Sequence, residues 1–517
     1  WSSDVCSSDL GHGLGTRLAR QGAWGWGNQA CTRRRGQGRA SIDLLLPPVR
    51  NALEPPTNLH QQCPLLPPTR VCLRVLLAGL GLLATVAADQ AQEFAPGQVI
   101  DQVVTRADAK QSYAVYLPTT FSRTREWPVI FVFDPGARGR NAVERLRAAA
   151  ERFGYIVAGS NNSRNGPIDP QYRAMVAMIG DLSQRVPLDS KRVYTAGMSG
   201  GARVALRRAL ISGKIRGVLA FSAGLPTGME LPSKVPFAFF GTAGKTDMNY
   251  AELKRLDSDL ESRSATHRLA IFEGGHTWPP ADVVMAGVEW LELDAMRGGV
   301  RPKDDALVGT LLAARVAALP AAPAPEHWQA VQAVARDFHG LADVSAYEKQ
   351  AKELGATAEV KAWLKSDRKL IDREVEFLTG LDDAALAGDA AAMKQRVAAV
   401  PKLANGPDDS ADRALARRVL TVFSSSAREL VRAYFQQEDF EDAEIFLSAL
   451  VAFDPADSRT PYDLSRARAR LDDRTAALVD AVKAGYTNAS QATAEPAFAK
   501  LREDAAFKAL LAKMAQR

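Results

Sequence analysis

Two patterns of hydrophobic positions divide the chain. Between residues 111 and 296, short apolar runs rich in Val, Ile and Phe alternate with segments whose apolar residues recur at helical spacing. This alternation is typical of a largely parallel sheet with helices between its strands. Strands are predicted near residues 113–117, 129–133, 156–159, 192–195, 218–222, 237–240 and 268–272, and helices near 142–153, 172–185, 202–211, 250–262 and 281–296. We therefore expect an α/β domain at residues 93–298, of the usual domain size.

A second domain is predicted from residue 326 to residue 517, where only helical periodicity continues. Residues 299–325, which include the Pro/Ala segment LPAAPAP, are interpreted as a semi-rigid linker. Within the helical domain one segment fits the 34-residue helix-turn-helix repeat called TPR, because Leu430, Tyr434, Ala443, Leu447 and Pro455 fall at its spacing. About three repeats are usually needed to bury a continuous core. A TPR-like domain and an irregular helical bundle therefore both stay open.

The segment before residue 89 has a different character. Residues 70–88 place an uncharged run after Arg70 and Arg74, with small residues, Val86 and Ala88, before a cut at Asp89. This predicts a signal peptide, periplasmic or secreted localisation, and no stable membrane span after cleavage; a buried or anchoring helix is the alternative. Residues 1–69 lack periodicity, and their opening WSSDVCSSDL resembles adapter-derived translation, so we interpret them as artefactual or disordered.

Charge and cysteine change the picture once this segment is set apart. The chain has 65 basic and 59 acidic residues, but residues 1–88 hold nine arginines and four acidic residues. The remainder is therefore nearly neutral, which argues against a nucleic-acid-binding body. All four cysteines also precede residue 89. A disulfide framework, a cysteine-ligated metal or a thiol nucleophile is thus excluded from the two predicted domains.

The sharpest chemical signal is the pentapeptide GMSGG at 197–201, which lies between a predicted strand and a predicted helix. A sharp strand-to-helix turn needs small residues on both sides of a nucleophilic serine and leaves its hydroxyl exposed above the sheet. Ser199 is therefore the candidate nucleophile. The purely structural alternative is a glycine-rich turn in which the serine caps the helix.

A serine hydroxyl needs a base, and the base needs an orienting acid. His276 follows a predicted strand in the glycine-rich FEGGHTWPP, whereas His267 opens one, so His276 is the candidate base. Asp247 follows the strand VPFAFF in GTAGKTD and is the candidate acid, because Asp257 and Asp259 fall in a helical pattern. The order Ser, Asp, His is the one expected of strand-turn-helix hydrolases.

The tetrahedral intermediate also needs N–H donors for its oxyanion. We expect one donor from Gly200, which follows the nucleophile. The other is expected from the loop DPGARG, where Pro135 has no N–H, so Gly136 is the candidate and Ala137 is the next choice. DPGARG is also simply a good turn sequence. Asn161 and Asn162, after the strand YIVAG, are candidate substrate contacts, although turn formation explains them equally well.

The stretches VYTAGMSGGARVAL, GTAGKTD and FEGGHTWPP make residues 113–293 resemble α/β-hydrolases of the esterase, polyhydroxybutyrate depolymerase and dienelactone hydrolase type. This resemblance implies hydrolysis of carboxylic esters through an acyl-enzyme, a small-molecule or polymeric ester as substrate, and no metal or cofactor. Asp134-Pro135 stands where many such esterases carry His-Gly. Two alternatives remain open: a peptidase of the prolyl-peptidase-like group, and a non-catalytic scaffold whose helical domain binds a protein partner.

Overall fold

The structure is a computed structural model. It describes residues 94–515 except 322, 388, 399, 405–409, 454–456, 472–475 and 484. The predictions for residues 1–69 and for the signal peptide at 70–88, and all four cysteines, lie outside the described residues. Within the described part of the chain, no helix combines the length and the apolar character needed to cross a bilayer.

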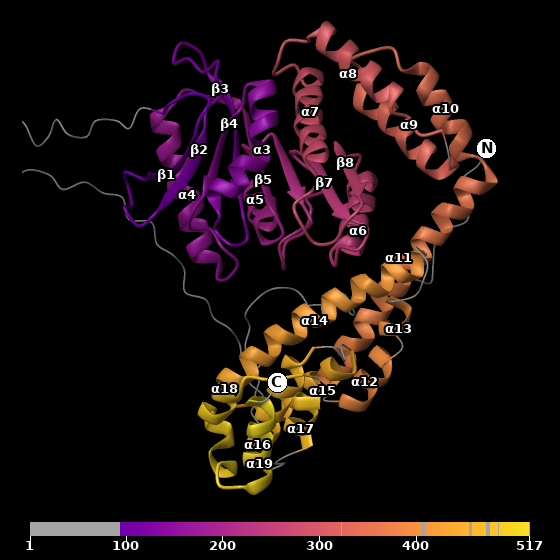
Figure 1. The fold of residues 1–517 in the computed structure, drawn as a ribbon. Coiled ribbons are helices and arrows are strands. Elements are labelled where there is room, and N and C mark those ends of the chain that lie inside the picture. Colours follow the sequence, from indigo (N-terminus) through magenta and orange to yellow (C-terminus); the bar gives the residue numbers. More distant parts are fainter. Residues whose placement is uncertain are drawn as a thin grey trace, which may run out of the picture. The chain divides into compact units, whose positions relative to one another are not determined.

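One eight-stranded sheet organises the first part of the described chain (Figure 1). Its strands are β1 (Val99–Val104), β2 (Ser112–Tyr116), β3 (Trp127–Phe133), β4 (Ile156–Ser160), β5 (Leu188–Met198), β6 (Gly217–Phe221), β7 (Ala238–Gly244) and β8 (His267–Phe272). Their order across the sheet is β1-β2-β4-β3-β5-β6-β7-β8. Pairing is parallel from β4 through β8, while β2 runs antiparallel to both of its neighbours. The predicted, largely parallel sheet is therefore confirmed.

Strand β3 is apolar along its whole length because helices cover both faces of the sheet. Every residue of β3 is buried. Helices α3 (Gly139–Phe153) and α7 (Ala281–Arg297) share one apolar cluster with Ile130 and Val132 of β3 and with Ala196 of β5. Side chains alternate between the faces of a strand, so Thr195 points to the other face, where its hydroxyl donates to the Ala205 carbonyl of α5 (Gly200–Ser212) at 3.1 Å.

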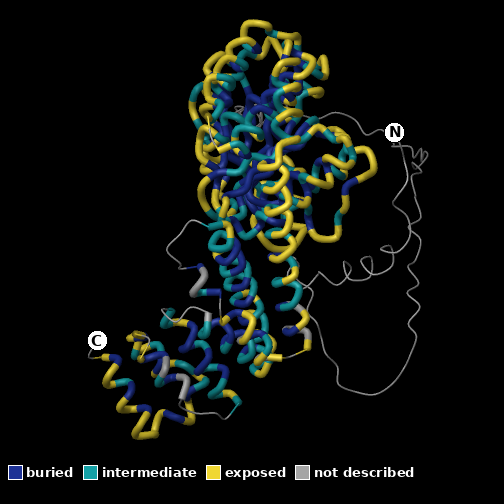
Figure 2. Tube along the Cα trace, turned by 90° about the vertical axis from the view of Figure 1, so that its right-hand side faces the viewer, coloured by how far each residue is buried: buried dark blue, intermediate teal, exposed yellow. Residues whose placement is uncertain are grey.

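Two further helices complete this α/β domain. They are α4 (Ile168–Arg185) and α6 (Tyr250–Ser262), of which α6 packs on β7 and β8. The buried residues, dark blue in Figure 2, follow the strands and the inward faces of these helices. The strand order, together with a serine between β5 and α5, is that of the α/β-hydrolase fold, as the sequence resemblance implied.

The predicted linker at residues 299–325 is wrong over most of its length. Residues Asp305–Ala317 form helix α8, which is capped at its start by the Asp304 carboxylate accepting from the Leu307 N–H. Val308 and Leu311 are buried against Leu293 of α7 and Phe338 of α9 (Ala324–Phe338). The segment ALVGTLLAARVA has good helix formers and apolar residues at helical spacing, so it folds onto the domain.

The remainder is helical, as predicted. It comprises α10 (Ser345–Gly355), α11 (Ala358–Leu386), α12 (Ala390–Ala398), α13 (Val400–Ala404), α14 (Ala411–Gln437), α15 (Phe440–Phe453), α16 (Arg459–Arg470), α17 (Ala476–Lys483), α18 (Ala489–Ala494), a 3₁₀ turn at Pro496–Leu501 and α19 (Ala505–Ala515). Consecutive helices from α14 to α17 pack against each other, and the Tyr434 ring of α14 stacks on Phe446 of α15. Pro455 of the candidate repeat lies outside the described residues, and the TPR assignment stays a prediction.

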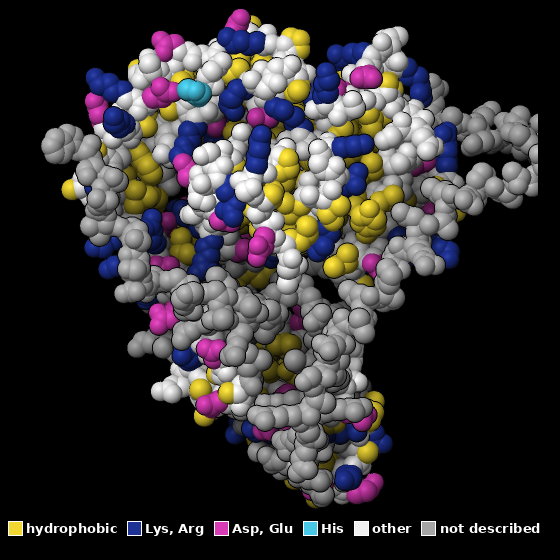
Figure 3. Space-filling model, turned by 180° about the vertical axis from the view of Figure 1, so that it is seen from behind, with side chains coloured by type: hydrophobic (Ala, Val, Ile, Leu, Met, Phe, Trp, Pro, Cys, Tyr) yellow, Lys and Arg dark blue, Asp and Glu magenta, His cyan; other side chains and the backbone are white. Residues whose placement is uncertain are grey.

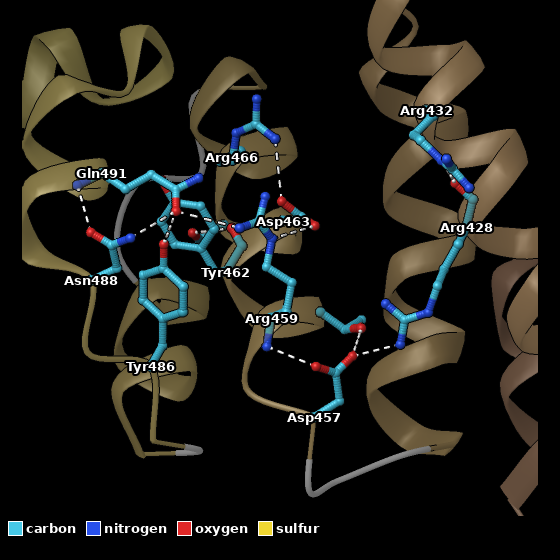
Figure 4. A network of polar contacts seen from close by, with 12 residues as sticks. Arg428, Arg432, Asp457, Arg459, Tyr462, Asp463, Arg466, Tyr486, Asn488 and Gln491 are labelled. Atoms are coloured by element: carbon cyan, nitrogen blue, oxygen red, sulfur yellow. Dashed lines mark hydrogen bonds and ion pairs between the residues drawn. The ribbon is translucent and has the colours of Figure 1, made fainter.

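A polar network joins the last helices of this region (Figure 4). The rings of Tyr462 and Tyr486 stack with centroids 4.1 Å apart. The Tyr486 hydroxyl donates to Gln491 Oε1 at 2.8 Å, and Asn488 caps α18 by accepting from the Gln491 N–H at 3.0 Å. These contacts fix α18 against α16 through aromatic and polar side chains.

Charged side chains of both signs are interspersed on the face of the molecule seen in Figure 3. Among the described residues, some charged side chains form ion pairs along single helices, such as Arg147 with Glu144 of α3 at 2.9 Å. Exposed pairs of this kind contribute about 0–1 kcal/mol each. On that face, therefore, the surface charge does not gather into a patch of one sign.

Candidate active site

Ser199 occupies a strained turn between β5 and α5. Its φ of 54° and ψ of −124° lie outside the regions that non-glycine residues usually adopt. Such strain is typical of functional sites and persists only where the surrounding structure enforces it. The Ser199 N–H donates to the Phe221 carbonyl at 2.8 Å, which holds the turn against β6.

The glycines around Ser199 are required by close backbone approach. A Cβ atom on Gly201 would lie 2.0 Å from the Phe133 carbonyl oxygen, and one on Gly197 would lie 2.3 Å from the Gly201 carbonyl carbon. Either contact is far below van der Waals distance. The G-x-S-x-G spacing is thus the sequence signature of a turn whose two arms touch.

The structure brings the three predicted triad residues together. His276 Nε2 lies 2.8 Å from Ser199 Oγ, and His276 Nδ1 lies 2.8 Å from Asp247 Oδ1. Asp247 comes from the loop after β7 and His276 from the loop after β8. With Nδ1 donating to the carboxylate, Nε2 is free to accept the serine proton.

Asp247, the candidate acid, is held by groups that the sequence analysis did not identify. Asp247 is fully buried, and its Oδ1 also accepts the N–H of Asn249 at 2.9 Å. The Asn249 side chain in turn donates to the Ser222 carbonyl at 2.8 Å. An asparagine two residues after a candidate acid is a turn signal that could have identified this support.

The loops that carry Asp247 and His276 are also tied to each other. The N–H and the hydroxyl of Thr246 both donate to the Gly274 carbonyl, each at 2.9 Å. The Ser222 hydroxyl donates to the Thr277 carbonyl at 3.0 Å, next to His276. The relative position of Asp247 and His276 therefore rests on several hydrogen bonds besides their own.

The two predicted oxyanion donors differ in their surroundings. Gly200 is the first residue of α5, where N–H groups have no acceptor within the helix. The Gly136 N–H instead donates to Asp134 Oδ1 at 2.8 Å, and the Ala137 N–H donates to the Asp134 carbonyl at 3.0 Å. Both N–H groups are engaged within their own turn, so this geometry does not favour the predicted role of Gly136.

Asp134, which departs from the His-Gly of many esterases, is the centre of that turn. It is 1% exposed and accepts from Arg138 Nε at 2.8 Å and from Arg138 Nη2 at 3.0 Å. Its Oδ2 also accepts from the Trp278 indole at 3.2 Å. Because Trp278 follows His276 by two residues, one buried carboxylate links the turn after β3 to the loop that carries His276.

The side chains of the predicted substrate contacts Asn161 and Asn162 are used elsewhere. Asn161 Nδ2 donates to the Asp101 carbonyl at 3.0 Å. Asn162 accepts the Ser112 N–H at 2.8 Å and donates to the Lys110 carbonyl at 3.0 Å. Both amides thus brace β1, β2 and the connection between them, and no contact with Ser199 supports their predicted role.

The histidine and acids set aside in the sequence analysis lie outside the triad. The side chain of His267, at the start of β8, is 5% exposed, and its Nδ1 lies 2.9 Å from the Ala265 carbonyl oxygen. Asp257 and Asp259 are on α6, as their helical pattern predicted.

Comparison with known proteins gives a fold likeness alone. No family model and no curated protein sequence matches this chain. Among solved structures, it is similar to an S-formylglutathione hydrolase of Staphylococcus aureus, with 14% identity over 38% of this chain and 97% of that one and a TM-score of 0.32. A fluorophosphonate-binding serine hydrolase of the same organism matches at 15% identity, 38% and 98% coverage and a TM-score of 0.32. Esterase B from Lactobacillus rhamnosis matches at 17% identity, 44% and 96% coverage and a TM-score of 0.31.

Proposed function

We propose that this protein is a serine hydrolase that cleaves carboxylic esters through an acyl-enzyme. The observation that carries the proposal is the continuous hydrogen-bonded chain from Ser199 Oγ through His276 to the buried Asp247, at 2.8 Å for each link. A nucleophile, a base and an orienting acid in this geometry are the parts that acyl transfer requires.

In the acylation half, Ser199 Oγ attacks the carbonyl carbon of the ester while His276 Nε2 accepts the hydroxyl proton. The π electrons of the carbonyl move onto its oxygen, which becomes the oxyanion that the Gly200 N–H faces. When the intermediate collapses, the bond to the alcohol oxygen breaks, and His276 returns its proton to that oxygen. The alcohol leaves, and the acyl group stays on Ser199.

In the deacylation half, water takes the place of the alcohol. His276 removes one proton from the water as its oxygen attacks the acyl carbon, and the second intermediate breaks the bond to Ser199 Oγ. The proton on His276 then goes to Ser199, and the carboxylic acid is released. Asp247 stabilises the imidazolium in both halves and itself stays unprotonated.

The test compares wild type with Ser199→Ala on p-nitrophenyl acetate, butyrate and octanoate, with Ser183→Ala as control. Ser183 is an exposed serine on α4 whose hydroxyl donates to the Ile179 carbonyl of its own helix. We expect Ser199→Ala to lose activity by at least about 10⁴-fold with an unchanged circular dichroism spectrum, and Ser183→Ala to retain it. Retained activity in Ser199→Ala would defeat the proposal. Faster cleavage of a prolyl-peptide anilide than of all three esters would favour a peptidase.

A further inference from the structure

In the turn after β3, the two N–H groups considered as the second oxyanion donor both have acceptors within the turn. Oxyanion sites of this kind usually combine the N–H after the nucleophile with one from another loop. In the turn after β3, Pro135 has no N–H, while the N–H groups of Gly136 and Ala137 donate to the Asp134 carboxylate and carbonyl. Four hydrogen bonds hold the Asp134 carboxylate in place, so the turn does not readily release Gly136.

The side chain of Asn165 lies against Gly200, whose N–H is the first predicted oxyanion donor. A Cβ atom on Gly200 would lie 1.8 Å from Asn165 Oδ1, 2.8 Å from its Cγ and 3.3 Å from its Nδ2. The carboxamide therefore packs directly on the residue that follows Ser199. This contact also explains why position 200 is a glycine, since any side chain there would displace the amide.

The backbone of Asn165 is fixed to the turn after β3. Its N–H donates to the Pro135 carbonyl at 2.8 Å, and its neighbour Arg164 forms a β-bridge with Gly136. Asn165 thus belongs to the same side of the site as the turn whose own N–H groups are engaged.

Asn165 is an exposed residue, and its side chain differs from those of Asn161 and Asn162, whose amides are engaged in hydrogen bonds. Among the described residues, its side chain has no hydrogen-bond partner. A half-turn about the Cβ–Cγ bond exchanges Oδ1 and Nδ2, so the amide can present an N–H without breaking a hydrogen bond to a described group.

We propose that the Asn165 side chain is the second oxyanion donor, acting with the Gly200 N–H. The inference rests on the proposed function, because it assigns a residue to the same acyl transfer. Nδ2 donates a hydrogen bond to the carbonyl oxygen as it becomes negative, and no covalent bond to Asn165 forms or breaks. Removing one such donor typically lowers kcat by 10²–10³-fold.

The experiment measures kcat and KM of Asn165→Ala and Asn165→Asp on p-nitrophenyl butyrate. The aspartate has nearly the same shape as asparagine but places a negative charge beside the oxyanion. We expect kcat to fall about 10²–10³-fold in Asn165→Ala and at least as far in Asn165→Asp, with KM within about threefold of wild type. The rate of inactivation by a p-nitrophenyl alkylphosphonate should fall in parallel, because its transition state places charge at the same oxygen.

Gln171→Ala serves as the matched control. It removes an amide whose Nε2 donates to the Gly166 carbonyl at 3.0 Å, next to Asn165, and it should keep wild-type kcat. A kcat of Asn165→Ala within threefold of wild type would overturn the inference, as would a raised KM with unchanged kcat. These outcomes differ from a failure of the proposed function, in which Ser199→Ala would retain activity. Thermal unfolding of each variant separates a lost donor from a lost fold.

Discussion

Replacing Asp247 with asparagine isolates the contribution of its negative charge. Two donors converge on Asp247 Oδ1, namely His276 Nδ1 at 2.8 Å and the Asn249 N–H at 2.9 Å. Oδ2 is buried and has no partner among the described residues. An asparagine at this position therefore places its oxygen at the site of Oδ1 and its amide nitrogen at the site of Oδ2. His276 then keeps the tautomer that catalysis needs, and the carboxylate charge alone is lost.

The size of the effect follows from the distance between the charges. Two unit charges 2.8 Å apart interact by about 6 kcal/mol at an effective dielectric constant of about 20. This attraction exists only once His276 is protonated, so it acts on the transition state and not on the resting enzyme. At 1.36 kcal/mol per decade, its loss predicts a decrease in kcat of about 10⁴-fold.

The assay is steady-state hydrolysis of p-nitrophenyl butyrate at about pH 7.5 by wild type and Asp247→Asn, with thermal unfolding as the control. The buried amide nitrogen has no acceptor among the described groups, which costs about 1–3 kcal/mol and lowers Tm by roughly 2–4 °C per kcal/mol. The variant should nevertheless remain folded at 25 °C. A kcat within tenfold of wild type would refute the assigned role of Asp247.

Three further predictions concern the fold. Gly201→Ala should yield little folded protein, because its Cβ would lie 2.0 Å from the Phe133 carbonyl oxygen; a wild-type Tm and kcat would contradict this. Burial alone would raise the pKa of Asp181, but hydrogen bonds, first among them that from Arg185, lower this pKa overall. The Asp181 carboxylate therefore stabilises the fold above about pH 4, and this stabilisation is lost as the pH falls through the lowered pKa. In urea titrations, the difference in free energy of unfolding between wild type and Asp181→Asn should therefore become smaller from about pH 5 to about pH 3. A difference that stays constant over this range would contradict the assigned role of Asp181. Phe423→Ala should destabilise the helical region by about 3–5 kcal/mol, because that ring is fully buried in its core, and an unchanged unfolding midpoint of the helical signal would disprove this.

The strands of the sheet and the individual candidate residues Ser199, Asp247 and His276 could be predicted because a local pattern marks each of them. Strands buried on both faces, such as β3, are continuous apolar runs, and the turn at Ser199 requires glycine at fixed positions. The edge strand β1, whose sequence is VIDQVV, was missed because it is only partly buried and its polar residues break the apolar run. Helix α8 was missed because the Pro/Ala segment LPAAPAP, which follows it, is typical of a linker.

The contacts around the triad could not be predicted because they join residues far apart in the chain. Asp134 and Trp278 are 144 residues apart, and no local pattern relates them. The same holds for Asn165 and Gly200, which meet only when the loops after β3, β4 and β5 come together at one edge of the sheet. The glycine at position 200 does indicate that another group lies close to its backbone, since it has no side chain of its own, but it does not indicate which group.

Labelling of the native protein with a fluorophosphonate, followed by peptide mass mapping, tests whether Ser199 is an activated nucleophile. The phosphonyl group bonds to a serine only where a base removes the hydroxyl proton. We expect a single modified peptide that contains Ser199, and no labelling of Ser199→Ala. Absence of label from the folded wild-type protein, or labelling at another residue, would contradict it.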